Sequence, residues 1–122
     1  MRVAAALSTL LLAFVLAGCS GASGATTPST DSSGRYVIHL TSANQFNPAN
    51  AKVPVGATVV WVNDGGGAAH DVQARDGSFS SGPAAGLKEG DSYAHTFNQT
   101  GTFAYFCHVH DGSGMHATLT VA

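Results

Sequence analysis

The sequence has few charged residues, few cysteines and few methionines. Of its 122 residues only 10% are charged, five of them basic and seven acidic. No basic run or arginine cluster occurs, so nucleic acid is not expected as a partner. The sequence also offers no nucleophile–base pair, no carboxylate pair within one motif and no phosphate-binding loop, so we expect no enzyme activity.

Cys19 and Cys107 are the two cysteines, too few for the disulfide framework that small exported domains often use. Export is nevertheless expected, because Arg2 and a mainly apolar run over residues 3–17 are typical of a signal peptide. That run is shorter than the roughly 20 apolar residues that a membrane-spanning helix needs, so a transmembrane anchor is the weaker interpretation.

The residues LAGC at positions 16–19 resemble the lipobox of bacterial lipoproteins. This resemblance implies cleavage of a signal peptide over residues 1–18 and lipidation of Cys19. The mature protein would then be anchored to the cell membrane and would face the periplasm or the cell exterior. An ordinary cleavable signal with a chance cysteine is the alternative. If Cys19 carries lipid, Cys107 has no partner within the chain, and a bound metal is one way to occupy such a lone thiol.

The rest of the chain divides into a linker and a folded domain. Residues 20–34 read SGASGATTPSTDSSG and cannot seed a core, which predicts a flexible linker over residues 19–34. The folded domain is expected over residues 35–122. Short runs rich in β-branched and aromatic residues predict strands over residues 36–41, 51–55, 57–62, 70–74, 92–97, 102–106 and 116–121. Seven or so strands in so short a domain indicate a β-sandwich or small barrel, with one helical turn expected near residues 83–87.

Soft ligand atoms are concentrated in one segment, CHVHDGSGMH at residues 107–116. Cys107, His110 and Met115 follow the spacing C-x2-H-x4-M, and two histidines, one cysteine and a weak axial methionine are the ligands of blue-copper sites. Phe103, Tyr105 and Cys107 alternate along a predicted strand, which places Cys107 at its buried end.

The second histidine must come from elsewhere in the chain. Among His39, His70 and His95, the best candidate is His70, because it follows a predicted strand and the loop NDGGGAA. Glycine and alanine give that loop little bulk, so its backbone could lie close to a metal. His39 and His95 fall within predicted strands, where histidine seldom acts as a ligand.

Two long segments resemble plastocyanin-like and halocyanin-like cupredoxins, the type 1 blue copper proteins. These segments are FNPANAKVPVGATVVWVNDGGGAAHDV and GTFAYFCHVHDGSGMHATLTV. The resemblance implies an all-β, cupredoxin-like Greek-key sandwich of about seven to eight strands. It also implies one copper ion per chain, cycling between Cu(I) and Cu(II) and bound by His70, Cys107, His110 and Met115, with the histidines binding through Nδ1. His110 would lie nearest the surface and be the point where electrons enter and leave.

The residues around these expected ligands are partly typical of the family and partly not. Asn63 and Asp71 are expected to brace the ligand segments. The family often has asparagine at the position of Asp71, whose carboxylate should favour Cu(II) and lower the reduction potential. It also often has proline at the position of Val109, so the loop is expected to be less rigid here.

Together these features predict a monomeric one-electron carrier that moves electrons between redox protein partners at the outer face of a membrane. A copper-binding or delivery protein is an alternative, but Met1 and Met115 are too few methionines for a Met-rich carrier. A subunit of a copper-containing oxidoreductase is a weaker alternative, because it would need a second copper site. His108 and His116 are expected to be exposed, with a weak surface metal site as the other possibility.

Overall fold

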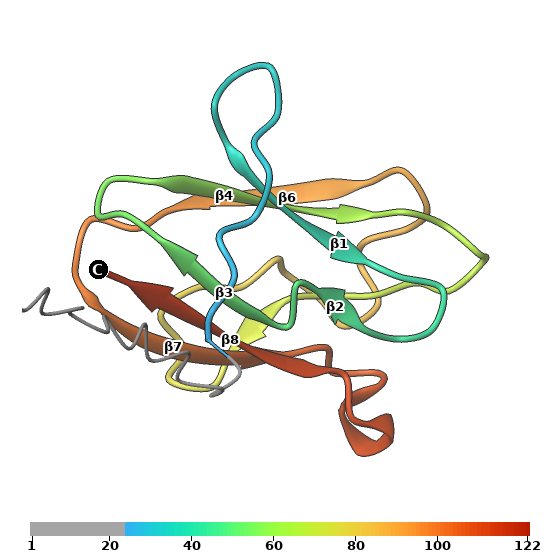
Figure 1. Cartoon of the computed structure of the whole chain (residues 1–122). Helices are drawn as coiled ribbons and strands as arrows, with labels where there is room; N and C mark the ends of the chain where they lie inside the picture. The colour runs from blue at the N-terminus through green and yellow to red at the C-terminus, as the bar shows by residue number, and fades with distance from the viewer. Residues whose placement is uncertain (1–23) are drawn as a thin grey trace, which may run out of the picture.

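The computed structural model describes residues 24–122 as two four-stranded β-sheets packed face to face (Figure 1). The expected signal peptide and Cys19 lie outside the described residues. One sheet has the order β2-β1-β4-β6, formed by Phe46–Asn47, Tyr36–Leu40, Thr58–Asn63 and Ser92–Thr96. The other has the order β3-β8-β7-β5, formed by Asn50–Val53, His116–Val121, Gly101–Phe106 and Gln73–Ala74. The expected all-β sandwich is confirmed.

Both sheets are mixed, because each contains one parallel pair. Strand β1 runs parallel to β4, and β3 runs parallel to β8, while the remaining neighbours are antiparallel. Alternating side chains point into the space between the sheets, as in β8, whose burial alternates along its whole length. The chain therefore buries one face of each sheet and leaves the other face to solvent.

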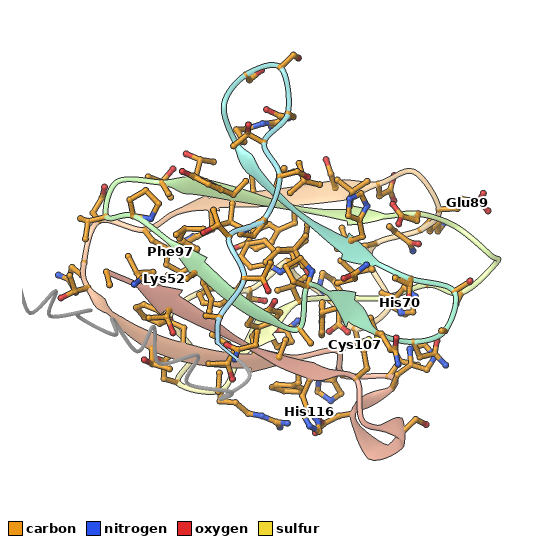
Figure 2. The ribbon with its side chains drawn as sticks, in the orientation of Figure 1. Lys52, His70, Glu89, Phe97, Cys107 and His116 are labelled. Carbon is orange, nitrogen blue, oxygen red and sulfur yellow. The ribbon has the colours of Figure 1, made fainter. Side chains whose placement is uncertain are left out.

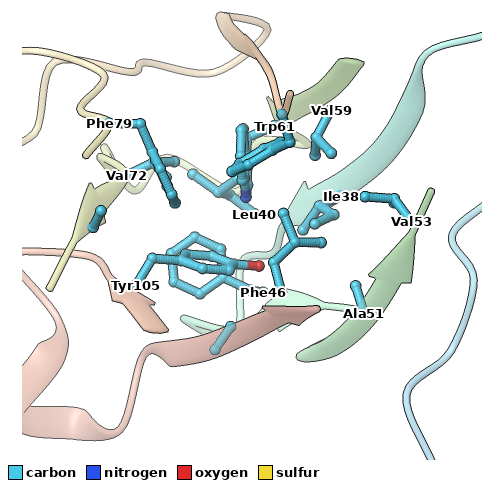
Figure 3. Packing of buried hydrophobic residues seen from close by; sticks show 14 of the residues in the cluster. Ile38, Leu40, Phe46, Ala51, Val53, Val59, Trp61, Val72, Phe79 and Tyr105 are labelled. Atoms are coloured by element: carbon cyan, nitrogen blue, oxygen red, sulfur yellow. The ribbon is translucent and has the colours of Figure 1, made fainter. Parts of the chain in front are cut away.

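Trp61 of β4 lies at the centre of this core (Figure 3). Its ring stacks on Phe79 and on Tyr93 at centroid separations of 5.5 Å each, and it meets Tyr105 edge-on at 5.6 Å. Such offset and edge-to-face contacts are the arrangements that aromatic rings prefer. The aromatic cluster joins the two sheets, since Tyr105 belongs to β7 and Trp61 to β4.

Three local predictions differ from the structure. Of the strand expected over residues 70–74, only β5 at residues 73–74 forms. The backbone of Val72 makes hydrogen bonds with Ser81 instead of with a neighbouring strand. The helical turn expected near residues 83–87 is a turn closed by a hydrogen bond from Gly86 N to Pro83 O. Strand β2, which the sequence did not predict, is two residues long and pairs with the end of β1.

Residues 24–34, the described part of the segment expected to be a flexible linker, make backbone hydrogen bonds to the domain. Thr26 N donates to Asn50 O, and Lys52 N donates to Thr26 O, so Thr26 pairs alongside the edge strand β3. Pro28 is buried, and Val37 N donates to Ser29 O. Small polar composition suggested a solvated coil, but the backbone of this segment finds partners at an open sheet edge.

The hairpin formed by β7 and β8 extends from one end of the sandwich to the other. The loop between these strands, residues 107–115, closes one end, and β8 then runs to Val121, which pairs beside Val53 at the opposite end. Figure 2 shows His70 and Cys107 together at the loop end, with Lys52 and Phe97 toward the other. Among residues 24–122, no helix has the length and apolar character needed to cross a membrane.

Candidate metal centre

Cys107 is positioned by the alternation of β7. Tyr105 and Cys107 both have 0% exposure and belong to the core, as the spacing of the strand predicts. The Cys107 amide donates to Met115 O at 3.0 Å, which closes the loop between the two residues. The thiol is therefore held at the buried end of a strand and is not bonded to a second cysteine.

His110 and Met115 are held by hydrogen bonds within the same loop. Ser113 N and Met115 N both donate to His110 O, at 2.9 and 3.1 Å. The loop contains a short 3-10 helix, η1 (Asp111–Ser113), and turns back at Gly114, whose φ of 90° is in the left-handed region that favours glycine. Met115 is fully buried, whereas His110 remains partly exposed.

His70 is brought to this end of the sandwich by the loop that follows β4. It is fully buried, and its backbone makes two 2.9 Å hydrogen bonds with Leu87, one in each direction. The glycine-rich loop before it packs closely against another segment of the chain. Gly66 packs so closely on Ser42 that a Cβ there would collide with that side chain, so the glycine serves packing between loops.

The structure brings three of the four expected ligands together. Cys107 Sγ lies 3.6 Å from His110 Nδ1 and 3.9 Å from His70 Nδ1, and the two Nδ1 atoms are 3.2 Å apart. A first-row metal ion forms bonds of about 2.0–2.1 Å to nitrogen and about 2.3 Å to sulfur. Three such donors around one ion in a plane are separated by roughly 3.5–3.8 Å, so the observed spacing fits a single ion.

The donor chemistry also fits copper. Thiolate, two imidazoles and a thioether at Met115 match the trigonal His2Cys set with a weak axial methionine that blue-copper sites use. Met115 lies in the same loop, with backbone hydrogen bonds to both Cys107 and His110, so its thioether would be the fourth donor. Among residues 24–122, His70, Cys107 and His110 form the group whose ligand atoms lie within 4.8 Å of one another.

Burial shifts the pKa values of two of these groups. It lowers the pKa of His70, and the neighbouring His110 lowers it further, while the backbone of Thr41 and the carboxylate of Asp71 act in the other direction. The neutral imidazole that a metal requires is therefore favoured. Burial also raises the pKa of the Cys107 thiol, so a cation at this position would be needed to favour the thiolate.

Asp71 and Asn63 make hydrogen bonds to the segments around the clustered ligand atoms, each through different contacts. Asp71 is fully buried and accepts a 2.7 Å hydrogen bond from the His108 amide, which ties the His70 segment to the loop of Cys107. Asn63 donates from Nδ2 to Ala68 O and to Leu87 O, both at 2.9 Å. It thus spans the loop before His70 and the segment that pairs with His70.

Sequence reasoning missed Gln73, which supports Asp71. Gln73 Nε2 donates to Asp71 Oδ2 at 2.9 Å and to Gly82 O at 2.8 Å. The alternation of side chains on residues 71 and 73 was the available signal, but no sequence motif marks the pair.

The remaining histidines lie away from the three clustered ligand atoms. His108 and His116 are exposed, as predicted. His39 lies on β1 and contacts Asp64 at 2.7 Å, and the His95 ring packs edge-on against Phe97.

A family model described as "Copper binding proteins, plastocyanin/azurin family" matches residues 37–122, most of the chain. The chain belongs to this family. It is a cupredoxin-like blue copper protein, and its cofactor is copper. The predicted resemblance is thereby confirmed, together with the cofactor it implied.

Curated relatives of this cupredoxin include plastocyanin from Scenedesmus fuscus, 36% identical over 83 residues, which cover 62% of this chain and 85% of that protein. Halocyanin from Natronomonas pharaonis is 34% identical over 100 residues, covering 75% of this chain and 60% of that protein. The cupredoxin therefore spans most of the length of the first relative and a smaller share of the second.

Solved structures show the same fold. A purple cupredoxin from Nitrosopumilus maritimus has a TM-score of 0.60 at 29% identity, covering 70% of this chain and 98% of that one. A copper-containing nitrite reductase from Thermus scotoductus has a TM-score of 0.62 at 23% identity. The match covers 79% of this cupredoxin but only 25% of the reductase, so it shows a shared domain fold alone.

Proposed function

We propose that this cupredoxin is a one-electron carrier whose single type 1 copper is held by His70, Cys107, His110 and Met115. The observation that carries the proposal is the convergence of Cys107 Sγ and the two Nδ1 atoms within 4.8 Å at one end of the sandwich. Bound copper supplies reversible Cu(I)/Cu(II) chemistry. The protein's part is to hold the donors, exclude water and leave one edge accessible to a partner.

Rigid positioning of the donors supports electron transfer over metal delivery. Cys107 directly follows strand β7, the His70 backbone makes two hydrogen bonds with Leu87, and Asp71 joins the two ligand segments. Cu(I) and Cu(II) prefer different geometries, so a site held by this many bonds changes little with each electron. A delivery protein instead needs a site that opens readily.

The burial of the four residues indicates where electrons pass. His70, Cys107 and Met115 have 0% exposure, so a partner cannot touch them directly. His110 is partly exposed, and Val109 beside it is 51% exposed. Electrons therefore enter and leave through the His110 imidazole, with a partner redox protein docked over this end.

We further propose that the protein is exported and acts as a monomer on a lipid anchor at Cys19. The support for export and lipidation is the LAGC sequence after an apolar run. Donor and acceptor would be redox proteins at the outer face of the same membrane, within reach of the anchor.

Visible and EPR spectroscopy of the copper-loaded protein test the electron-carrier proposal. We expect an intense thiolate charge-transfer band, a small copper hyperfine splitting and one copper per chain. Cys107→Ser should remove the band, whereas His108→Gln, a histidine one position away with an exposed side chain, should keep it. Loading beyond one copper per chain, or rapid loss of copper to a chelator without reversible voltammetry, would contradict the proposal.

A further inference from the structure

The segment that carries His70 is tied to the ligand loop at two points, one on each side of His110. The inner tie is the hydrogen bond from the His108 amide to Asp71. The outer tie is an ion pair between Arg75, directly after β5, and Asp111, directly after His110. Both ties join residues 71–75 to residues 108–111, so together they fix how the two histidine ligands face one another.

The outer tie has the geometry of a strong ion pair. Arg75 Nη1 donates to Asp111 Oδ2 at 2.9 Å and Nη2 donates to Oδ1 at 2.6 Å, which is the bidentate fork. The guanidinium also lies 4.0 Å above the centroid of the Phe106 ring, and the Arg75 amide donates to Ala104 O. Arg75 is therefore fixed to β7 on one side and reaches the loop with the other.

Packing cannot replace this tie. The 3-10 helix that begins at Asp111 has no buried residue, and no side chain caps its N-terminus. Val109 is exposed and lacks the fixed φ that a proline would give. The loop between His110 and Met115 is thus held by backbone bonds to His110 O and Asp111 O, by the Arg75 fork and by a longer, 3.8 Å contact between His116 and Asp111.

We propose that Arg75 is a positioning residue for the copper site, which holds His110 in ligating geometry through Asp111. That this restraint serves a copper site rests on the proposed electron-carrier function. The contact between Arg75 and Asp111 itself involves protein atoms alone. Arg75 supplies from outside the loop the restraint that Val109 does not supply from within. Removing the fork frees the tip of the loop, and with it the His110 imidazole.

Hydrogen exchange of the copper-free, full-length protein tests the restraint directly. The amides of Ser113, Gly114 and Met115 report on the loop, because all three donate to His110 O or Asp111 O. In Arg75→Gln we expect these amides to exchange roughly three- to tenfold faster, because one bidentate ion pair that restrains the loop is lost. The Phe97 amide, bonded to Ala57 O away from the loop, should be unchanged.

Arg35→Gln is the matched control. Arg35 pairs with Asp31 at 2.8 Å, and the side chains of that pair are 43% and 24% exposed, close to the 45% and 33% of Arg75 and Asp111. The control should leave the loop amides unchanged. Asp111→Asn should speed the loop amides at least as much as Arg75→Gln, because it also weakens the 3.8 Å contact between Asp111 and His116. The double variant should be no worse than Asp111→Asn alone, because both substitutions break the Arg75–Asp111 fork.

Copper-loaded protein gives the second readout. Arg75→Gln should lose copper to a chelator roughly three- to tenfold faster than wild type and should show altered copper hyperfine splitting, while Arg75→Lys should recover part of both. Unchanged loop exchange in Arg75→Gln, or equal changes in Arg75→Gln and Arg35→Gln, would overturn the proposal. If the wild type does not turn blue, the electron-carrier function fails, yet the exchange measurement on copper-free protein still decides the role of Arg75.

Discussion

Asp71 places a carboxylate between the two segments that carry the ligands. It is fully buried and accepts from both the His108 amide and the Gln73 side chain. An acceptor in this place braces the loop whether it is a carboxylate or an amide oxygen. The charge, in contrast, acts on the copper, because a nearby anion favours the more positive oxidation state.

Replacing Asp71 by Asn separates these two contributions. Asn retains an oxygen that can accept from the His108 amide, but it removes the negative charge. We expect Asp71→Asn to raise the midpoint potential, on the order of tens of millivolts for one charge at this range. Protein-film voltammetry measures the shift, with Asp76→Asn as a control on an exposed carboxylate. An unchanged potential in Asp71→Asn would show that the charge does not tune the site.

Asn63 contributes stability rather than tuning. Its side chain makes three hydrogen bonds at 2.9 Å, two to the carbonyls of Ala68 and Leu87 and one from the Gly65 amide. Asn63→Ala would leave these buried groups without partners. We expect the free energy of unfolding to fall by about 2–4 kcal/mol. Urea denaturation measures this loss, and Asn98→Ala, at an exposed position, should cost far less. A loss as small as that of the control would mean that water replaces the Asn63 contacts.

The N-terminal segment acts as an extra strand-like element at the edge of β3. Thr26 both donates to Asn50 O and accepts from Lys52 N. Thr26→Pro removes the donor, so the free energy of unfolding should fall by about 1 kcal/mol. Thr27→Pro is the matched control, because no backbone bond of Thr27 joins it to β3. Thermal unfolding of both variants compares them, and equal destabilisation would show that pairing at Thr26 is not the cause.

Elements with strong local signals could be predicted from the sequence, and elements fixed by tertiary contacts could not. Strands β4, β7 and β8 are dense in β-branched and aromatic residues, and their predicted bounds agree with the structure to within one residue. Strand β2 has only Phe46 and Asn47, so no alternation could mark it. The N-terminal segment has no apolar pattern, and its order comes from an edge strand elsewhere in the chain.

The candidate metal centre shows the same division. Cys107, His110 and Met115 were predictable because they share one loop, and the structure holds Cys107 and His110 within ligand distance of one another. His70 was predicted from its place after a strand and a glycine-rich loop. The Arg75–Asp111 pair spans 36 positions in the sequence, and only the fold brings it beside the loop.

At the scale of the whole molecule, the two ends of the sandwich differ. One end holds the ligand loop with the partly exposed His110, and the other holds the turn after β3 and the end of β8. Within residues 24–122, each end exposes one large apolar side chain: Val109, 51% exposed, beside His110, and Val55, 47% exposed, in the turn after β3. If electrons pass through His110, only the first of these valines lies where a partner must dock.

The two valines therefore give a matched test of docking direction. Val109→Ser should slow electron self-exchange between two copies roughly three- to tenfold, because burial of this side chain on docking contributes about 1 kcal/mol. Val55→Ser removes a similar apolar surface from the other end and should leave the rate unchanged. NMR line broadening in mixtures of reduced and oxidised protein measures the rate, and the visible spectrum of each variant checks that the copper site is intact. Equal slowing in both variants, or slowing only in Val55→Ser, would place the electron path away from His110.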